Sequence, residues 1–373
     1  MSGVVISGTG LWIPESKLTN EELVDCYNKH VDVYNAEHAT AIANEEQKAK
    51  AYSSAAFIEK ASGIKSRYIY QKKGVLDLDR MRPDIPVRDN AELSDQAEMA
   101  IHAAKKAMLA AGKEASDIDA VIVSCAYTQR SYPAIAIEVQ EALGIEGFGF
   151  DMLVACSAAT FALQRAYEMV KAGTAKCVLA INPELTSPQV NYKDRDSHFI
   201  FGDVSIATIV EQKDTCNSAG SFEILSTKAF TKYSNNIRSN FGYVLNANDS
   251  DPLDKKQYFS QNGRAVYKEV CPMAAAHITD HLSSIDLKNE DIKRWWLHQA
   301  NINMNKLICS ILLGRQPSEQ EAPIVLDEFA NTASAGSLIA FNKYKGDFQS
   351  GDLGLICSFG AGYSIGSLIV KKL

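Results

Sequence analysis

Three polar side chains that can do chemistry stand at the edges of apolar segments. Cys156 ends the apolar run from Phe148 to Ala155 and opens an alanine-rich helical stretch. A thiol at a strand-to-helix junction lies at the positive end of the helix dipole, which favours the thiolate and predicts a nucleophile. His298 ends a second apolar strand, and Asn331 opens a short polar segment. A cysteine, a histidine and an asparagine so far apart in sequence are typical of a nucleophile and its partners.

The composition is that of an ordinary globular protein, and it argues against nucleic-acid and membrane binding. The 373 residues are 46% hydrophobic and 22% charged, with a formal net charge of −7. This acidic balance, without a basic cluster interleaved with aromatics, disfavours a nucleic-acid partner. No run reaches the roughly 18 continuous apolar residues of a membrane span. The first residues resemble a strand and not a signal peptide.

The eight cysteines are scattered through the chain without the spacing of metal ligands. Several lie in apolar strands, as reduced buried thiols do. We therefore expect no metal site and a cytoplasmic location.

Short apolar strands alternate with helical stretches along the chain. A strand at 120–124, a helix at 136–143 and a strand at 178–181 form one such unit. This rhythm predicts a mainly parallel, buried sheet with helices on its faces. The helix after Cys156 should end at Gly173, which is a typical helix stop.

A faint internal repeat predicts two related halves. The strand at Val121, with the segment before it, is echoed by the strand at Trp295, and residues 201–207 are echoed by 359–366. We therefore expect an N-terminal half at 1–213 and a C-terminal half at 214–373, with a site at their junction.

Two stretches interrupt this rhythm and are predicted to be insertions. Residues 28–56 are polar and alanine-rich with helical character, and residues 72–93 have the prolines and charges of an irregular surface loop. Insertions of this kind often cover a substrate.

Four motifs in order resemble the β-ketoacyl-[acyl-carrier-protein] synthase III family. They are Asp-Met-Leu-Val-Ala-Cys at 151–156, His-Gln-Ala-Asn at 298–301, Asn-Thr-Ala-Ser-Ala at 331–335 and Phe-Gly-Ala-Gly at 359–362. The resemblance covers most of the chain. It implies an α/β thiolase fold, a five-layer αβαβα sandwich of two pseudo-duplicated halves, and a homodimer. It implies no cofactor, because acyl-coenzyme A is a substrate.

The resemblance also implies a role for each motif. Cys156 would take an acyl group from acyl-coenzyme A as a thioester, with the backbone N–H groups of Cys156 and Ala361 as the oxyanion hole. Ala361 stands where a glycine is common in the family. His298 and Asn331 would donate hydrogen bonds to the thioester carbonyl of malonyl-[acyl-carrier protein] while CO2 leaves. The enolate would then attack the thioester on Cys156.

Less specific positions are carried over from the same family. Phe57 stands where a tryptophan is usual and Ala61 where an arginine is usual, so the nucleotide contacts of coenzyme A are expected to be altered. The residues implied for coenzyme A are Phe57, Lys60 and Arg195, those for the acyl pocket are Tyr132 and Phe201, and those for carrier-protein docking are Lys268 and Lys306.

We therefore expect an acyltransferase of fatty-acid synthesis that performs a decarboxylative Claisen condensation. The two insertions make the chain longer than acetyl-primed members, which favours the medium-chain β-ketodecanoyl type with an octanoyl-like primer. Three alternatives remain open: head-to-head condensation of two acyl-coenzyme A molecules, a polyketide-type enzyme, and a non-catalytic acyl-binding relative. Hydroxymethylglutaryl synthases are disfavoured because they lack the asparagine partner.

Overall fold

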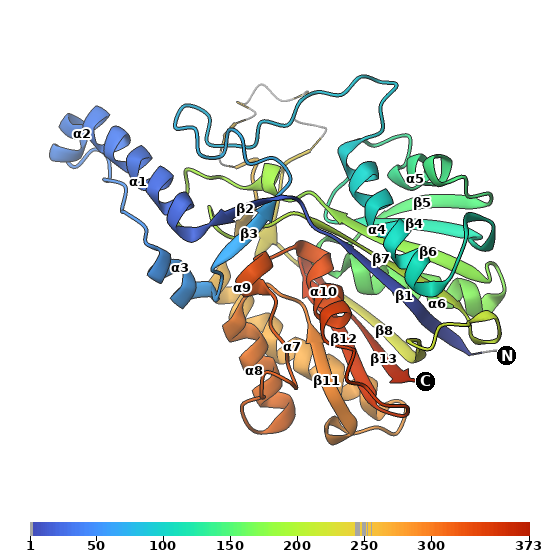
Figure 1. The fold of residues 1–373 in the computed structure, drawn as a ribbon. Coiled ribbons are helices and arrows are strands. Elements are labelled where there is room, and N and C mark those ends of the chain that lie inside the picture. Colours follow the sequence, from blue (N-terminus) through green and yellow to red (C-terminus); the bar gives the residue numbers. More distant parts are fainter. Residues whose placement is uncertain (1–2, 243–246, 248–250, 252, 255) are drawn as a thin grey trace.

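A nine-stranded sheet forms the centre of the molecule in the computed structural model, which describes residues 3–242, 247, 251, 253–254 and 256–373 (Figure 1). Its strand order is β11-β12-β13-β8-β1-β7-β6-β4-β5. The strands are β1 (Val4–Trp12), β4 (Ala120–Cys125), β5 (Phe148–Leu153), β6 (Cys177–Glu184), β7 (Val204–Gln212), β8 (Phe222–Ser234), β11 (Ile292–Leu297), β12 (Leu353–Gly360) and β13 (Gly362–Lys372).

The expectation of a mainly parallel sheet is wrong. Only the pairs β4–β5, β4–β6 and β11–β12 are parallel, and the pairs that involve β1, β7, β8 and β13 are antiparallel. The reason lies in the connections. A parallel pair needs a long crossover, whereas β12 and β13 are separated by Ala361 alone and must therefore run antiparallel.

Helices cover both faces of the sheet. They are α4 (Asp95–Ala111), α5 (Ile135–Leu143), α6 (Ala158–Ala172), α7 (Gly263–Ser283), α8 (Ile302–Leu313) and α10 (Gly336–Lys343). The predicted helix after Cys156 is confirmed as α6, and it ends at Gly173 in the left-handed conformation.

Alternating side chains along the strands sort the molecule into layers. In β6, Val178 and Ala180 join a central core with α6 and α10, while Leu179 and Ile181 join an outer core with α4 and α5. In the other half, Leu355 of β12 packs into a third core with α7 and α8. Two helical layers, α4–α5 and α6–α10, enclose the half of the sheet that contains β1 and β4–β7. The layers α6–α10 and α7–α8 enclose the other half, which contains β8 and β11–β13. This arrangement is the predicted five-layer sandwich.

The two halves share the same order of elements. From the centre outwards, β8, β13, β12 and β11 on one side match β1, β7, β6 and β4 on the other. A short 3-10 turn precedes each central helix: residues 155–157 before α6 and residues 333–335 before α10. The division at residue 213 stays a prediction, because β1 and β8 pair directly and the sheet is continuous.

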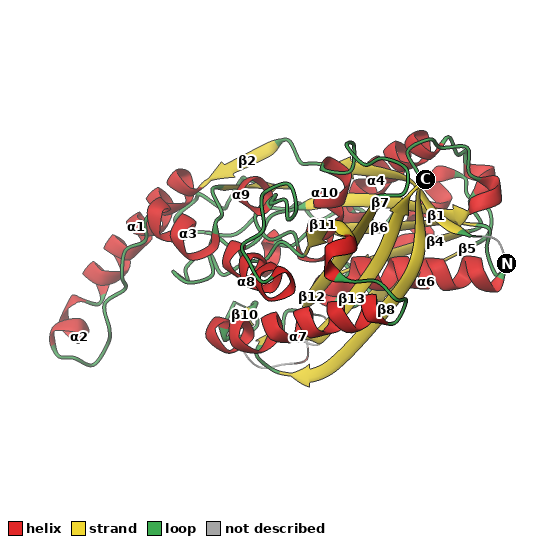
Figure 2. Cartoon of the chain, turned by 90° about the horizontal axis from the view of Figure 1, so that it is seen from below, coloured by secondary structure: helices red, strands yellow, loops and turns green. Residues whose placement is uncertain are grey.

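The first insertion forms an arm that projects from the body (Figures 1 and 2). Helix α1 (Asn20–Glu37) begins with a capping box between Thr19 and Glu22, and α2 (Ala39–Ala43) forms the tip. The helical character expected for residues 28–56 is therefore confirmed over part of its length. The chain returns from the tip as an extended segment and enters α3 (Ala55–Ser62).

Two asparagines clamp the returning segment against α1. Asn28 exchanges two hydrogen bonds with the backbone of Ser53, at 3.1 and 2.9 Å. Asn35 does the same with Lys50, at 3.1 and 2.8 Å. Seven helical residues and three extended residues both span about 10 Å, so the two clamps match in spacing.

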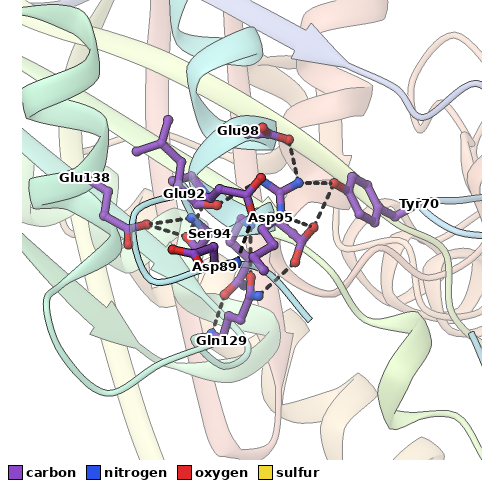
Figure 3. Close-up of polar contacts among 12 residues, drawn as sticks. Tyr70, Asp89, Glu92, Ser94, Asp95, Glu98, Gln129 and Glu138 are labelled. Carbon is purple, nitrogen blue, oxygen red and sulfur yellow. Dashed lines mark hydrogen bonds and ion pairs between the residues drawn. The ribbon is translucent and has the colours of Figure 1, made fainter. Parts of the chain in front are cut away.

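The second insertion, residues 72–93, contains no helix or strand, as predicted. It lies between β3 (Ser66–Ile69), which pairs antiparallel with β2 (Ser16–Thr19), and the start of α4. Arg88 anchors its end by donating hydrogen bonds to Asp95, Glu98 and the Tyr70 hydroxyl. Figure 3 shows Tyr70, Asp95 and Glu98 gathered at this point.

The remaining elements are short. They are α9 (Leu326–Phe329), which leads to Asn331, and the strand pair β9 (Ile237–Arg238) with β10 (Ser260–Gln261). No helix among the described residues is long and apolar enough to cross a membrane.

Candidate active site

Cys156 lies in the 3-10 turn between β5 and α6. Ala155, the residue before it, has a φ of 45°, in the left-handed region that non-glycine residues rarely occupy. Ala330, which precedes Asn331, has a φ of 57°. Strained backbone of this kind costs about 1–3 kcal/mol per residue and concentrates at functional sites. The surrounding fold therefore holds both residues in a tightly determined position.

The backbone at Gly360 lies closer to Cys156 than a side chain at position 360 would allow. A Cβ at Gly360 would lie 2.4 Å from the Cβ of Cys156 and 3.1 Å from its sulfur. The backbone N–H groups of Ala361, the next residue, and of Cys156 itself both reach the sulfur. Two N–H donors therefore converge beside the sulfur of Cys156.

Asn331 is held by backbone and side-chain hydrogen bonds. Its N–H donates to the carbonyl of Ile200 (2.9 Å), and its carbonyl accepts from Gly202 (3.1 Å). Its side-chain Oδ1 accepts from the N–H of Ala333 at 2.9 Å. Because Oδ1 is engaged, the amide group left for other partners is the Nδ2 donor.

His298 follows β11 directly, and its N–H donates to the carbonyl of Cys357 at 2.8 Å. Its ring lies edge-on to Phe359, with ring centroids 5.4 Å apart. Burial lowers the pKa of His298 to about 4, although a hydrogen bond with the backbone of Ala333 opposes this shift. The imidazole is therefore neutral at pH 7.

Cys156, His298 and Asn331 line one small, largely apolar cavity of about 40 Å³. Sequence reasoning missed most of the other residues around it, because nothing in sequence distinguishes them from ordinary core side chains. The residues missed are Ile237, Phe259, Gln261, Val266, Val270 and Met304, whereas Ala300, Phe359 and Gly360 belong to the motifs at 298–301 and 359–362.

A second cavity, of about 240 Å³, continues outwards from the first. The two share Gln261, Val266, Ala300, Met304 and Asn331, and the outer one extends to Phe57 and Tyr267. None of its lining residues belongs to 28–56 or 72–93. Within the described chain, the insertions therefore do not cover this passage.

The expectation that the helix start lowers the pKa of Cys156 is wrong in this structure. Burial and the negative charge of Glu184 raise the pKa of Cys156 to about 12, although the N–H groups of Ala361 and Cys156 lower it. Withdrawal from water opposes the thiolate more strongly than two backbone donors favour it. The sequence shows that a helix begins here, but it cannot show how far the packed protein excludes water from the thiol.

Two of the three residues expected to bind coenzyme A lie together. The guanidinium of Arg195 stacks over the ring of Phe57 at 4.0 Å, and its Nε donates to the carbonyl of Tyr52 at 2.8 Å. Lys60 does not join them. It lines a different cavity, of about 940 Å³, which also contains Lys306.

The residues expected at the acyl pocket and at the carrier-docking surface do not line the inner cavity. Phe201 is buried but does not line the inner cavity; it packs against Phe259, which does, with ring centroids 4.8 Å apart. Tyr132 is 78% exposed in the single chain. Lys268 is exposed on α7, next to Tyr267 at the outer cavity.

Comparison with known proteins agrees with this geometry. Residues 150–232 match the model of the 3-oxoacyl-[acyl-carrier-protein] synthase III family, and residues 282–372 match the model of its C-terminal part. The chain is 52% identical over 349 residues to the β-ketodecanoyl-[acyl-carrier-protein] synthase of Pseudomonas aeruginosa PAO1, covering 94% of this chain and 100% of that protein. The chain belongs to the β-ketoacyl-[acyl-carrier-protein] synthase III family.

More distant members of this family agree. A β-ketoacyl-[acyl-carrier-protein] synthase III of Acidiphilium cryptum is 28% identical over the full length of both chains. The crystal structure of the 3-oxoacyl-[acyl-carrier-protein] synthase III of Aquifex aeolicus superposes with a TM-score of 0.76 at 24% identity, covering 99% of this chain and 100% of that one. The thiolase fold is thus confirmed, and the protein is a condensing acyltransferase of fatty-acid synthesis.

Proposed function

We propose that this enzyme extends a medium-chain acyl-coenzyme A, octanoyl in the simplest case, by two carbons taken from malonyl-[acyl-carrier protein]. A β-ketodecanoyl product has ten carbons, and a condensation that adds two must start from eight. The 52% identical relative is named for that product. The single observation that carries the proposal is that Cys156, His298 and Asn331 line one cavity.

In the first step the sulfur of Cys156 attacks the thioester carbon of the primer. The carbonyl oxygen becomes negative and accepts hydrogen bonds from the N–H groups of Cys156 and Ala361. The carbon–sulfur bond to coenzyme A breaks, and the thiol proton leaves with the coenzyme A thiol. A thiol with a raised pKa therefore does not need to be ionised before substrate arrives.

In the second step the malonyl thioester loses CO2. The electron pair of the broken carbon–carbon bond moves into an enolate, whose oxygen accepts hydrogen bonds from His298 and Asn331. The engaged Oδ1 of Asn331 supports the donor role of Nδ2. The low pKa of His298 supports a neutral ring, which carries one N–H donor.

In the third step the enolate carbon attacks the thioester on Cys156, and the sulfur leaves as a thiolate that takes a proton from solvent. The β-ketoacyl group then departs on the carrier protein. These steps use only side chains and main-chain groups of the enzyme, so they need no cofactor.

The outer cavity is the proposed route for the pantetheine arm, because it connects the surface at Phe57 with Asn331. At its mouth we propose that Phe57 and Arg195 bind the adenine of coenzyme A, and that Lys268 contributes to docking of the acidic carrier protein. Lys60 and Lys306 line the neighbouring larger cavity instead. We propose that Lys60 contacts coenzyme A, and Lys306 the carrier protein, from that surface.

We also propose a homodimer that forms along β5, an edge strand of the sheet. Its residues Phe148 and Leu153 are 42% and 54% exposed, and an edge strand with exposed apolar side chains favours pairing with another chain. Tyr132, exposed in the single chain, would then reach the acyl pocket of the partner. The free state of all eight cysteines supports a cytoplasmic location.

Mass spectrometry of the intact protein with octanoyl-coenzyme A tests the first step. We expect one octanoyl adduct, its loss in Cys156→Ala, and its retention in Cys177→Ala, a buried thiol at the far end of β6. Absence of the adduct in the unmodified enzyme would leave only the acyl-binding alternative.

Product analysis with primers of different length tests the second and third steps. We expect β-ketodecanoyl-carrier protein, and no product when malonyl-carrier protein is omitted. Acetyl-coenzyme A turning over as well as octanoyl-coenzyme A would contradict the primer assignment. A product formed without malonyl-carrier protein would establish head-to-head condensation instead.

A further inference from the structure

Glu184 is a buried acid beside the active site that the steps above do not use. It is the last residue of β6 and is 1% exposed. One carboxylate oxygen accepts from both the N–H (3.1 Å) and the hydroxyl of Ser334, and the other accepts from the N–H of Ala126 (3.1 Å). Glu184 thus joins the end of β4, the end of β6 and the turn before α10.

Ser334 belongs to the same short loop as Asn331, one of the two proposed enolate donors. Asn331 begins this loop and is fixed there by the backbone of Ile200 and Gly202. Ala333 donates to the side chain of Asn331 and contacts the ring of His298. The loop is therefore held at its start by a backbone bridge and at Ser334 by Glu184. Ala333, which contacts both donors, lies between these two points.

We propose that Glu184 is a positioning residue, which holds the loop 331–335 so that Asn331 and His298 point at the enolate oxygen. This inference rests on the proposed function. It assigns Glu184 to decarboxylation and condensation, not to acylation of Cys156. Its charge cannot assist the thiol, because a nearby anion disfavours the thiolate.

A carboxyl group suits this position better than the amide of the same shape. Burial raises the pKa of Glu184 to about 7, although hydrogen bonds from Ser334 and Ala126 oppose the shift. The ionised form accepts from all three donors, and the neutral form can donate to the Ser334 hydroxyl while still accepting from both N–H groups. An amide must turn its NH2 towards one of the two N–H donors, which leaves a buried bond unmade.

The test compares the two half-reactions in Glu184→Gln. We expect acylation of Cys156 by octanoyl-coenzyme A, followed by intact mass, to stay within about threefold of the unmodified rate. Condensation of the preformed acyl-enzyme with malonyl-carrier protein should fall by about 10- to 100-fold, the loss typical of catalytic groups displaced by about 1 Å. Glu184→Asp, which keeps the acceptors but is shorter, should recover part of this loss.

Ser334→Ala probes the same contact from its other end and serves if Glu184→Gln does not fold. It removes the hydroxyl donor and keeps the N–H, so we expect a smaller loss, about three- to tenfold, again in condensation alone. The double variant should lose less than the product of the two single effects, because both remove one contact.

Asp119→Asn is the matched control. Asp119 accepts from the N–H groups of Lys176 and Cys177 at the opposite end of β6. We expect it to lower thermal stability without separating the half-reactions. Equal loss of both half-reactions in Glu184→Gln, or no loss in either, would overturn the inference. Failure of the unmodified enzyme to form the adduct would instead overturn the proposed function.

Discussion

Gly360→Ala tests the proposed oxyanion hole through the close approach of Gly360 to Cys156. The added Cβ would lie 2.4 Å from the Cβ of Cys156, whereas ordinary contacts begin at 3.4 Å, so the two segments must separate by 3.4 − 2.4 = 1.0 Å. This movement carries the N–H of Ala361 away from the oxyanion. A shift of about 1 Å, or the loss of one oxyanion donor, each cost roughly 100-fold or more in rate. Overpacking should also lower the free energy of unfolding by about 1–3 kcal/mol.

Rapid-quench mass spectrometry of octanoyl transfer to Cys156 measures this effect. We expect the acylation rate to fall by about 100-fold while the variant still folds by circular dichroism. Gly346→Ala is the control, because a Cβ there meets nothing within 4 Å. An acylation rate within threefold of the unmodified enzyme would show that the approach of Gly360 does not set the oxyanion donors, and the argument from this contact would fail.

Other predictions address the enolate donors, the dependence of stability on pH, and the dimer. Asn331→Asp keeps the acceptor for its loop and replaces the donor by an anion, so condensation should fall by about 10²–10³-fold with acylation spared, as half-reaction kinetics would reveal. The buried His298 and His277 have pKa values lowered to about 4, below the unfolded value near 6.5, so the unfolded state binds protons first. Stability should therefore be complete above pH 6.5 and decline towards pH 4, which thermal melting at a series of pH values checks; a constant melting temperature would refute it. Lysine at both Phe148 and Leu153 should yield monomers in light scattering, and an intact dimer would exclude the β5 edge as the interface.

The sequence predicts which three polar side chains meet in the inner cavity better than it predicts their surroundings. Cys156 and His298 were identified because each follows an apolar strand, and strand ends are visible as patterns. Glu184 ends such a strand as well, and this same signal was available for it. Its partner Ser334, however, lies 150 residues away, and no local pattern indicates that contact.

Rotation about a helix explains why the structure differs from the prediction for Lys60, and burial explains why it differs for the pKa of Cys156. Lys60 and Ala61 are adjacent in α3, but successive helical residues turn by about 100°, so only Ala61 faces the outer cavity with Phe57. The pKa of Cys156 depends on how much water the assembled core excludes. That quantity arises from packing between both halves, and no single segment of sequence contains it.

The hydrogen bonds of Asn28 and Asn35 fix how many residues the returning segment of the projecting arm can have between the two clamps. One extra residue between Lys50 and Ser53 would lengthen the extended side by about 3.3 Å, and the two clamps could no longer close together. Tyr52 lies inside this span and its carbonyl accepts from Arg195, so a slip there would disturb the pair of Arg195 and Phe57 at the mouth of the outer cavity. Residues 38–48, beyond the outer clamp, are free of this constraint, and insertions or deletions there should be neutral for catalysis.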